Sequence, residues 1–195
     1  TNFNAVSDGN LPTAGAFTAN GTAATGGGST SYLNAGTTLT LSGRTDFTEA
    51  QDATHSGLAT STLTIKTGSL SGDTCSGYGA PSTIVGTTSQ TVASGNCYLL
   101  TLTGTDNVGN VATVQTTVKV DTSAPSAPSA TGFTFSSLSN AYWPGGSSAT
   151  VYLKSGSTGN FTVAASGSTD AESAAPTYNY GAVAGTGWSN AAGAY

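Results

Sequence analysis

The chain has 195 residues, 27 of them glycine and none methionine, and only 7% are charged, giving a formal net charge of −5. Its four basic residues, Arg44, Lys66, Lys119 and Lys154, are scattered, which excludes the basic surface that nucleic-acid binding requires. No apolar run approaches the ~20 residues that a membrane-spanning helix needs, so no membrane span is predicted.

Short strands joined by turns are the expected structure, because threonine, serine, glycine and alanine dominate and runs of helix-forming residues are absent. The length suits one large or two ordinary domains, and the spacing of the strands favours two. Residues 1–14 are predicted to be an incoming linker, because Val6, Asp8 and Pro12 follow the same order as Val120 to Pro125. The first domain is predicted to span residues 15–122 and the second residues 123–195.

The predicted strands of the first domain begin with residues 16–20, followed by a glycine-rich loop over residues 22–31. A second strand at 37–42 is expected to turn Leu39 and Leu41 inward, and a third at 58–66 to turn Leu63 and Ile65 inward. A short fourth strand is expected near Cys75, and a fifth over the segments 82–85 and 89–93.

The clearest pattern in the chain is a hairpin between Cys97 and Val120. Apolar residues alternate with polar ones on both sides, at Tyr98, Leu100 and Leu102 and again at Val114, Val118 and Val120. Period two predicts two half-buried strands. The residues between them favour tight turns, so the strands should pair antiparallel. Pro125 then ends the strand ladder, because proline donates no backbone hydrogen bond.

The hairpin loop Thr105-Asp106-Asn107-Val108-Gly109-Asn110 and the segment Val120-Asp121-Thr122-Ser123-Ala124-Pro125 resemble the end of a bacterial immunoglobulin-like (Big-type) repeat. The resemblance implies tandem immunoglobulin-like β-sandwiches in large secreted or surface-attached bacterial proteins, often adhesins or their stalks. It implies no reaction, so no enzyme is expected. The expected role is that of a rigid extracellular stalk or adhesion module, whose partners are the neighbouring modules of the same chain and a cell-surface protein or glycan.

The second domain repeats the first in part. Residues 131–135 align with 15–18, and residues 161–170 align with 38–46. A hairpin carrying Tyr142, Trp143, Val151 and Leu153 is expected between those strands, and Tyr178 and Tyr180 are expected on a third core strand. The sequence ends before any counterpart of residues 97–120. We therefore expect an incomplete second sandwich, which a longer array or a partner strand would complete.

Cys75 and Cys97 are the only cysteines in the chain. Because no Cys-x-x-Cys motif or histidine cluster accompanies them, a disulfide is favoured over a metal site, with two unpaired buried thiols as the alternative. A disulfide implies an oxidising compartment, in agreement with an extracellular location.

Acidic residues are predicted to gather where the chain enters each domain, because strand direction reverses at every connection. Clustered carboxylates suit calcium, which binds six to eight oxygens, and junctional calcium recurs in the repeats that the sequence resembles. The alternative is that these residues cap turns. The candidate calcium ligands are Asp8, Asp46, Glu49 and Asp106, with Asp52 nearby, in the first domain, and Asp121, Asp170 and Glu172 in the second.

Other residue types give weaker hypotheses. A Ser-His-Asp site at His55, the only histidine, would need a spatial convergence that the sequence does not indicate, so we expect an exposed loop histidine. Lys119 is expected to face solvent, which argues against a lysine–asparagine cross-link. The alternative function is carbohydrate binding through aromatic side chains, although core packing is also consistent with the tryptophans. The candidate ligand-binding residues are Tyr142, Trp143 and Trp188.

Overall fold

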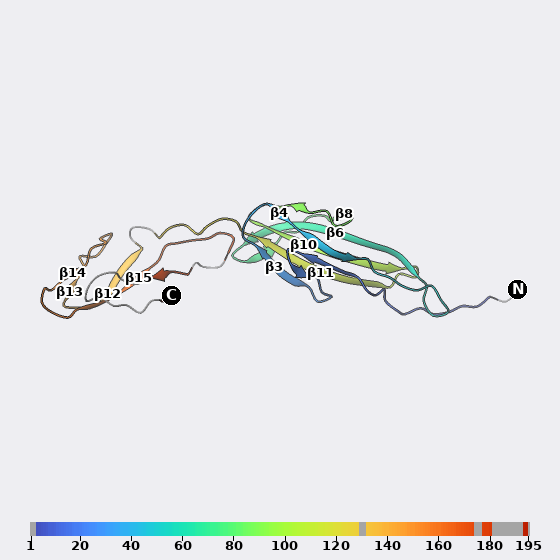
Figure 1. Ribbon diagram of the computed structural model, residues 1–195, viewed down its shortest axis with the longest axis horizontal. Coiled ribbons are helices and arrows are strands. Elements are labelled where there is room, and N and C mark those ends of the chain that lie inside the picture. Colours follow the sequence, from blue (N-terminus) through green and yellow to red (C-terminus); the bar gives the residue numbers. More distant parts are fainter. Residues whose placement is uncertain (1–2, 129–131, 174–176, 181–192, 195) are drawn as a thin grey trace. The chain divides into compact units, whose positions relative to one another are not determined.

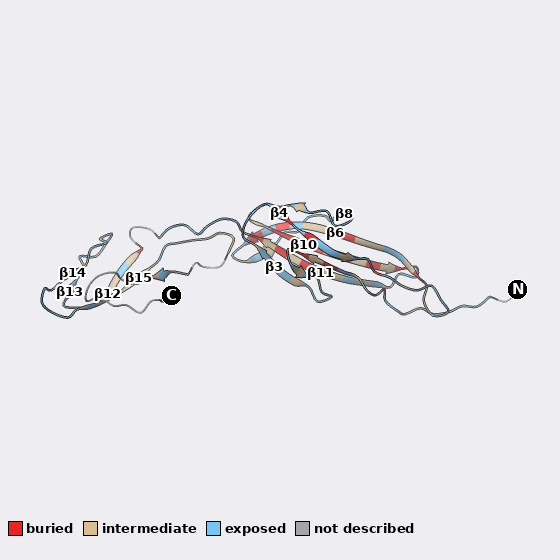
Figure 2. Cartoon of the chain, in the orientation of Figure 1, coloured by how far each residue is buried: buried red, intermediate tan, exposed pale blue. Residues whose placement is uncertain are grey.

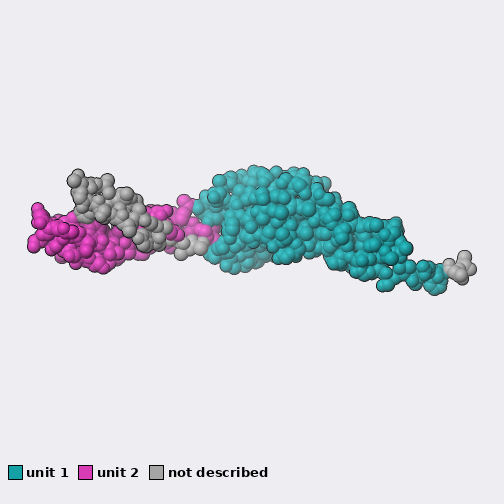
Figure 3. All heavy atoms as spheres, turned by 60° about the horizontal axis from the view of Figure 1, so that its bottom comes forward, with its two compact units in different colours: residues 1–123 teal, residues 124–195 magenta. Residues whose placement is uncertain are grey.

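A computed structural model describes residues 3–128, 132–173, 177–180 and 193–194 (Figure 1). The chain forms two compact units, Thr1–Ser123 and Ala124–Tyr195, which Figure 3 distinguishes by colour. The division between them falls inside the Val120–Pro125 segment on which the predicted domain boundary depended. No helix occurs in the described residues, and none is therefore long and apolar enough to cross a membrane. The predicted all-β class is confirmed.

The first unit contains two main sheets in a sandwich-like arrangement. The larger sheet has the strand order β3 (Ser29–Leu33), β11 (Val111–Val120), β10 (Asn96–Asp106), β6 (Leu58–Ser71) and β7 (Thr74–Ser76), with β8 (Ser82–Ile84) also paired to β6. The smaller sheet has the order β2 (Thr22–Ala23), β1 (Ala16–Ala19) and β5 (Leu41–Thr45). A separate short pair joins β4 (Thr38–Leu39) to β9 (Gln90–Thr91).

The predicted hairpin forms the centre of the larger sheet. Strands β10 and β11 pair antiparallel from Asn96 opposite Val120 to Thr105 opposite Val111, and β10 pairs with β6 on its other side. Its alternation has the predicted effect: Leu100 and Leu102 are fully buried, whereas Thr101 and Thr103, which alternate with them, are only half-buried. Figure 2 shows the buried residues collected along these strands. The inward side chains of the two sheets meet in one apolar core formed by Phe17, Ala19, Leu39, Leu41, Phe47, Leu63, Ile84, Val92, Tyr98, Leu100, Leu102, Val118 and Val120.

The glycine-rich segment 22–31, which the sequence predicted as a loop, instead contains β2 and the start of β3. Strand β3 pairs parallel with β11, from Ser29 opposite Thr116 to Leu33 opposite Val120. Backbone hydrogen bonds to the otherwise unpaired edge of β11 therefore order this segment, which lacks the apolar side chains that would order it by packing. Thr116 and Ser31 are buried beneath this pairing, at 0% and 6% exposure.

Two predicted strands are each divided between different partners. The segment 37–42 forms β4, which pairs with β9, and then β5, which pairs with β1. The segments 82–85 and 89–93, expected to form one strand, are β8 on β6 and β9 on β4. Both differences arise because a strand belongs to whichever neighbour it pairs with, and the local sequence does not specify that neighbour.

The second unit repeats the pairing that opens the first. Strand β12 (Phe133–Ser139) pairs antiparallel with β15 (Asn160–Ala165), as β1 pairs with β5, and both pairs contain a register irregularity. The expected hairpin is present as β13 (Ala141–Tyr142) and β14 (Tyr152–Leu153). A short pair joins β16 (Asn179–Tyr180) to β17 (Gly193–Ala194).

Aromatic side chains take the place of a fully buried core in the described part of the second unit. The ring of Phe135 lies 5.4 Å from the ring of Trp143 and 5.7 Å from that of Phe161, centroid to centroid. All three residues are half-buried. The fully buried apolar side chains among the described residues belong to the first unit.

Candidate cation site

Three carboxylates from distant parts of the sequence meet in the first unit. Asp8 precedes the first strand, Glu49 lies in the loop after β5, and Asp106 is the last residue of β10. One oxygen from each lies within 4.8 Å of one from each of the others. Since β10 ends beside the start of β6, with Asp106 opposite Leu58, the group lies at one end of the larger sheet. The sequence predicted this grouping of Asp8, Glu49 and Asp106.

Asp106 is held by its own hairpin turn. It is 2% exposed, and its Oδ1 accepts hydrogen bonds from the backbone N–H of Val108 at 3.0 Å and of Asn110 at 2.7 Å. Its Oδ2 accepts a third from Asn110 Nδ2 at 2.7 Å. Burial raises the pKa of Asp106, but these hydrogen bonds outweigh the burial and leave the pKa below its ordinary value. Asp106 is therefore an anion at neutral pH.

Asp8 connects the entering segment to two loops of the unit. Its Oδ1 accepts from the backbone N–H of Asn10 at 3.0 Å and its Oδ2 from that of Ser56 at 2.5 Å, and these hydrogen bonds lower its pKa. The carbonyl oxygen of Asp8 accepts from Asn110 Nδ2 at 3.3 Å. Further along, Thr13 exchanges two backbone hydrogen bonds with Thr48. Residues 8–13, predicted as part of a linker, are thus hydrogen-bonded to the first unit.

Glu49 differs from its two neighbours because its carboxylate is unsatisfied. Both Oε1 and Oε2 are buried without a hydrogen-bond partner among the described residues. Burial raises the pKa of Glu49, and the negative charges of Asp8 and Asp106 raise it further. The charge of His55 and the backbone of Gly57 lower this pKa by smaller amounts. A buried carboxylate without a partner is costly, so the arrangement favours either a proton or a cation beside Glu49.

Phe47 anchors the loop that carries Glu49. Phe47 is 4% exposed, and its backbone N–H donates to Ser61 Oγ at 3.0 Å. Its side chain lies over two glycines: a Cβ on Gly15 would be 2.4 Å from the ring, and a Cβ on Gly104 would be 2.5 Å from Phe47 Cβ. Both glycines are therefore required for Phe47 to pack. Sequence reasoning missed this anchor, whose only signal is an aromatic residue within an acidic loop.

Asp46 and Asp52, expected beside the group, have other partners, and Asp46 is not among the three clustered carboxylates in the described part of the chain. Asp46 Oδ1 accepts from Arg44 Nη2 at 2.8 Å and from Ser61 Oγ at 3.1 Å. The structure thus separates Asp46 from the group that it was predicted to join, because Arg44, two residues earlier, pairs with its carboxylate.

Asp52 caps its own loop. It accepts from the backbone N–H of Thr54 at 2.7 Å and from His55 Nδ1 at 2.8 Å. The hydrogen bond from Thr54, followed by that from His55, lowers the pKa of Asp52 to about 2. The hydrogen bond with Asp52 in turn raises the pKa of His55. His55 is half-buried rather than fully exposed.

The second predicted set of ligands is divided between the two units. In the second unit, Asp170 Oδ1 accepts from the backbone N–H of Glu172 at 3.1 Å and of Ser173 at 3.2 Å, and the latter bond is the main cause of its lowered pKa. In the first unit, Asp121 Oδ1 accepts from the backbone N–H of Ser123 at 3.1 Å. Asp121 and Asp170 thus cap turns, and their predicted grouping with Glu172 stays a prediction.

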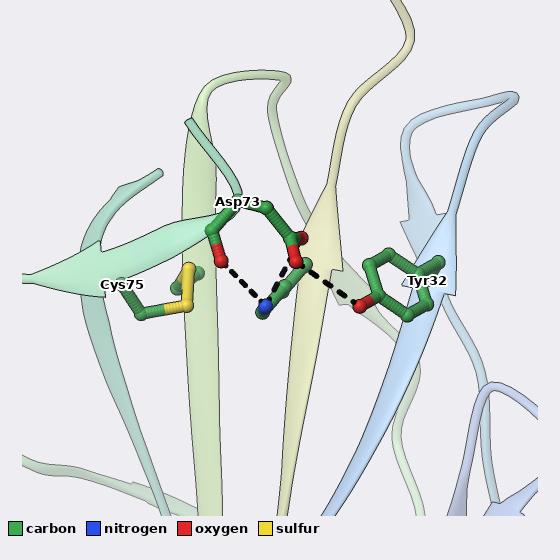
Figure 4. The surroundings of a disulfide bond; sticks show 5 residues. Tyr32, Asp73 and Cys75 are labelled. Atoms are coloured by element: carbon green, nitrogen blue, oxygen red, sulfur yellow. Dashed lines mark hydrogen bonds and ion pairs between the residues drawn. A yellow bond between two sulfur atoms is a disulfide. The ribbon is translucent and has the colours of Figure 1, made fainter. Parts of the chain in front are cut away.

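The predicted disulfide between Cys75 and Cys97 is confirmed, with 5.8 Å between the Cα atoms (Figure 4). It connects β7 to β10, the two strands that flank β6. Asp73, in the turn before β7, accepts from Lys119 Nζ through its Oδ1 at 3.0 Å and through its carbonyl oxygen at 2.6 Å. The exposure predicted for Lys119 is corrected: the residue alternates with Val118 and Val120 as expected, yet its side chain is only 15% exposed because Asp73 binds it.

The aromatic residues considered for carbohydrate binding have different environments. Trp143 packs on Phe135, and its Nε1 donates to the carbonyl oxygen of Ser148 at 2.8 Å, so its ring belongs to the interior of the second unit. Tyr142 is 62% exposed. Trp188 lies outside the described residues.

The chemistry of the three-carboxylate group suits a hard divalent cation. Three carboxylates place a formal charge of up to −3 within a radius that one ion can bridge, and calcium prefers such oxygen ligands. Turn capping explains Asp8 and Asp106, whose oxygens accept backbone hydrogen bonds. It does not explain Glu49, whose oxygens accept no hydrogen bond of ordinary geometry from the described residues.

No known protein family, curated protein or solved structure matches this chain.

Proposed function

We propose that this chain is a non-catalytic segment of a bacterial extracellular stalk or adhesion protein, built from consecutive immunoglobulin-like units. A divalent cation, calcium in the first instance, stiffens the chain where it enters the first unit. The observation that carries this proposal is the carboxylate of Glu49, whose buried oxygens have no hydrogen-bond partner in the described part of the chain and lie close to Asp8 and Asp106. Asp8 lies on the entering segment and the other two residues on the body of the unit, so one ion would bind both.

The strand pattern of the first unit supports an immunoglobulin-like sandwich. Strands β6, β10 and β11 are consecutive antiparallel neighbours, like strands C, F and G of that fold. Tyr98 lies near the start of β10, and its hydroxyl oxygen accepts a hydrogen bond from the N–H of Ala93 at 2.9 Å. This contact resembles the tyrosine corner of immunoglobulin-like domains. The β12–β15 pair, which repeats β1–β5, supports a second unit of the same kind.

An extracellular location is supported by the disulfide, since such bonds persist in oxidising compartments. The wide β6–β10–β11 sheet, whose inward side chains fill the core, supports a load-bearing module rather than an enzyme. Asp52 and His55, the pair from which a catalytic site could be built, form a local loop contact instead.

Thermal unfolding of the 195-residue protein at pH 7.5 tests the cation. The protein is first treated with a chelator and then given calcium or magnesium. A single site at about 100 times its dissociation constant should add about 2.7 kcal/mol to the free energy of unfolding. A melting temperature that neither ion changes would contradict the proposed cation.

Two variants locate the ion. Glu49→Gln removes the charge that burial and the neighbouring carboxylates disfavour, so it should raise the metal-free stability at pH 7.5 and abolish the gain on adding calcium. Asp46→Asn, whose side chain pairs with Arg44 outside the group, should keep that gain. A calcium effect that survives in Glu49→Gln would place the ion elsewhere.

A second candidate function, recognition of surface glycans, is favoured by one observation, the exposure of Tyr142. The packing of Trp143 against Phe135 does not favour the aromatic platform first expected from Tyr142, Trp143 and Trp188.

A further inference from the structure

Two exposed tyrosines form a pair on the β13–β14 hairpin of the second unit. Tyr142 and Tyr152 are direct cross-strand partners, and they are 62% and 60% exposed. Their ring centroids lie 6.3 Å apart, and the ring planes are tilted by only 32°. The rings are too close for a third ring to insert between them. Both rings are exposed, so they offer neighbouring apolar surfaces with a hydroxyl group on each ring.

The pairing register places one charged residue, Lys154, on the same face of the hairpin as the tyrosines. Asn140 and Lys154 extend the ladder by one position, with the backbone N–H of Lys154 donating to the carbonyl oxygen of Asn140 at 2.9 Å. Because side chains alternate along strands, Lys154 lies on the tyrosine face, whereas Ala141 and Leu153 lie on the other. Asn140 has a positive φ of 48° and its Nδ2 donates to the carbonyl oxygen of Thr158 at 2.7 Å. Residues 140–142 and 152–154 line an open groove of about 330 Å³.

Lys154 is a free cation in the described part of the chain. Its side chain is exposed and forms none of the three ion pairs found there, unlike Arg44 and Lys119. It is also the only basic residue between Ala124 and Tyr195. The groove therefore combines two aromatic rings and one unneutralised ammonium group.

We infer that this groove binds an acidic polysaccharide, by stacking one hexuronic acid unit on the Tyr142–Tyr152 pair and binding its carboxylate to Lys154. The C–H groups on the face of a sugar ring carry partial positive charge, and aromatic faces are negative, so the two surfaces attract. The tyrosine hydroxyls match the hydroxyls at the rim of the sugar. An open groove suits an amphipathic unit of a long chain, because the rest of that chain stays in solvent.

Other ligand classes fit this surface less well. A quaternary ammonium group would suit two tyrosines, but Lys154 on the same face would repel it. A nucleic acid strand needs several basic contacts along its backbone, whereas the second unit supplies one and the whole chain has a net charge of −5. A hexuronic acid chain needs only one cation for each sugar that stacks.

Calorimetric titration of the 195-residue protein with a galacturonic acid tetramer tests this inference. A galactose tetramer of the same linkage serves as the neutral probe. The buffer contains a chelator, so that a cation at Glu49 cannot contribute. We expect the acidic tetramer to bind, the Tyr142→Ala/Tyr152→Ala variant to weaken binding at least about tenfold, and raised salt to weaken it as well. Lys154→Gln should weaken the acidic tetramer about fivefold or more and leave any weak neutral binding unchanged.

Tyr32→Ala is the matched control, because Tyr32 is an equally exposed tyrosine, at 61%, but lies on β3 in the first unit. It should bind like the unaltered protein, and circular dichroism confirms that each variant is folded. Absence of binding to the acidic tetramer, or binding that the double variant retains, would overturn the inference. Equal binding of the two tetramers, or preference for choline or oligothymidine, would overturn it as well. None of these results depends on the proposed cation, whose test is the melting temperature with calcium.

Discussion

Three carboxylates in one small group have different ionisation properties, and hydrogen bonding is the reason. Asp8 and Asp106 accept backbone hydrogen bonds, which stabilise their anions and lower their pKa values. Glu49 accepts no hydrogen bond of ordinary geometry from the described residues, and burial together with the charges of Asp8 and Asp106 raises its pKa instead. In the metal-free protein, the ionisation of Glu49 therefore reduces stability as the pH rises through its raised pKa. Asp8 and Asp106 have the opposite effect, because the stability that they contribute is lost as the pH falls through their lowered pKa values.

His55 provides a direct test of the electrostatics beside this group. Its hydrogen bond with Asp52 raises its pKa above the ordinary 6.5. The stability from this pair is therefore fully present below pH 6.5 and is lost as the pH rises through the raised pKa. Asp52→Asn should return the pKa of His55 toward its ordinary value. An NMR pH titration measures this without ambiguity, because His55 is the only histidine.

Asp46→Asn serves as the control for that titration, because Asp46 pairs with Arg44 and is not among the groups that raise the pKa of His55. If Asp52→Asn left the pKa of His55 unchanged, the hydrogen bond between Asp52 and His55 would not be the cause of the raised pKa.

At the level of elements, glycines on strands decide where loops can pack. Gly104 on β10 leaves the space that Phe47 occupies, and Phe47 in turn holds the loop of Glu49 against the sheet. Because Gly104 has no side chain, Phe47 can pack against β10, and the loop that carries Glu49 is held in place. The conformational cost of a glycine within a strand is offset here by the burial of a phenylalanine.

Gly104→Val should displace Phe47 and destabilise the protein by about 1–3 kcal/mol, the range for overpacking a core. It should also weaken any cation binding, because Glu49 moves with the loop. Urea unfolding measures the first effect and calcium titration the second. Gly27→Ala, where a Cβ would meet nothing within 4 Å, should leave both unchanged. Equal stability of the two variants would show that Phe47 does not depend on Gly104.

The disulfide also acts between elements, since it connects β7 and β10, two strands that do not pair with each other. The sequence separation of Cys75 and Cys97 is 22, and closing such a loop stabilises the folded state by about 3 kcal/mol in the chain-entropy description. The variant with both cysteines changed to serine should lose about that amount in urea unfolding. Adding a reductant to the unaltered protein should give the same loss. If neither treatment changed the unfolding midpoint, the disulfide would contribute no stability.

On the scale of the molecule, the two units bury their side chains to different extents. The first has a continuous apolar core between two sheets, whereas the described part of the second relies on three half-buried aromatic residues, Phe135, Trp143 and Phe161. Since stability follows buried apolar area, the units should differ in local stability.

Native-state hydrogen exchange tests this difference. Amides of β10 and β6 should exchange only through global unfolding of the first unit. Amides of β12 and β15 should exchange at least about tenfold faster, because the second unit opens more readily. Amides within β2 and β9, which are short strands of the first unit, provide an internal reference for local fraying. Equal protection of β12 and β10 would contradict this prediction.

Sequence patterns were sufficient where the information is local. Alternation identified the β10–β11 hairpin and its inward residues, and reversal of strand direction brought Asp8, Glu49 and Asp106 together. Pairing between distant segments was not predictable: β3 lies beside β11 although Ser29 and Thr116 are 87 residues apart. Backbone pairing of this kind leaves no mark on side-chain order.

Errors among the site residues had a similar origin, because a partner was overlooked. Arg44 pairs with Asp46, which the sequence had placed with the three carboxylates. Asp73 binds Lys119, which was expected to be free. Tyr152 was missed because its importance depends on the cross-strand position of Tyr142.

The covalent link between β7 and β10 also limits how far the first unit can lengthen under tension. If the chain is pulled from both ends, the residues between Cys75 and Cys97 remain in a closed loop and cannot extend, so the extended chain is shorter by their length. At about 3.4 Å for each extended residue, the 22-residue separation corresponds to roughly 75 Å of extension that only reduction would release. An oxidised unit would therefore stop short of full extension, and its maximum reach would report the redox state of its surroundings.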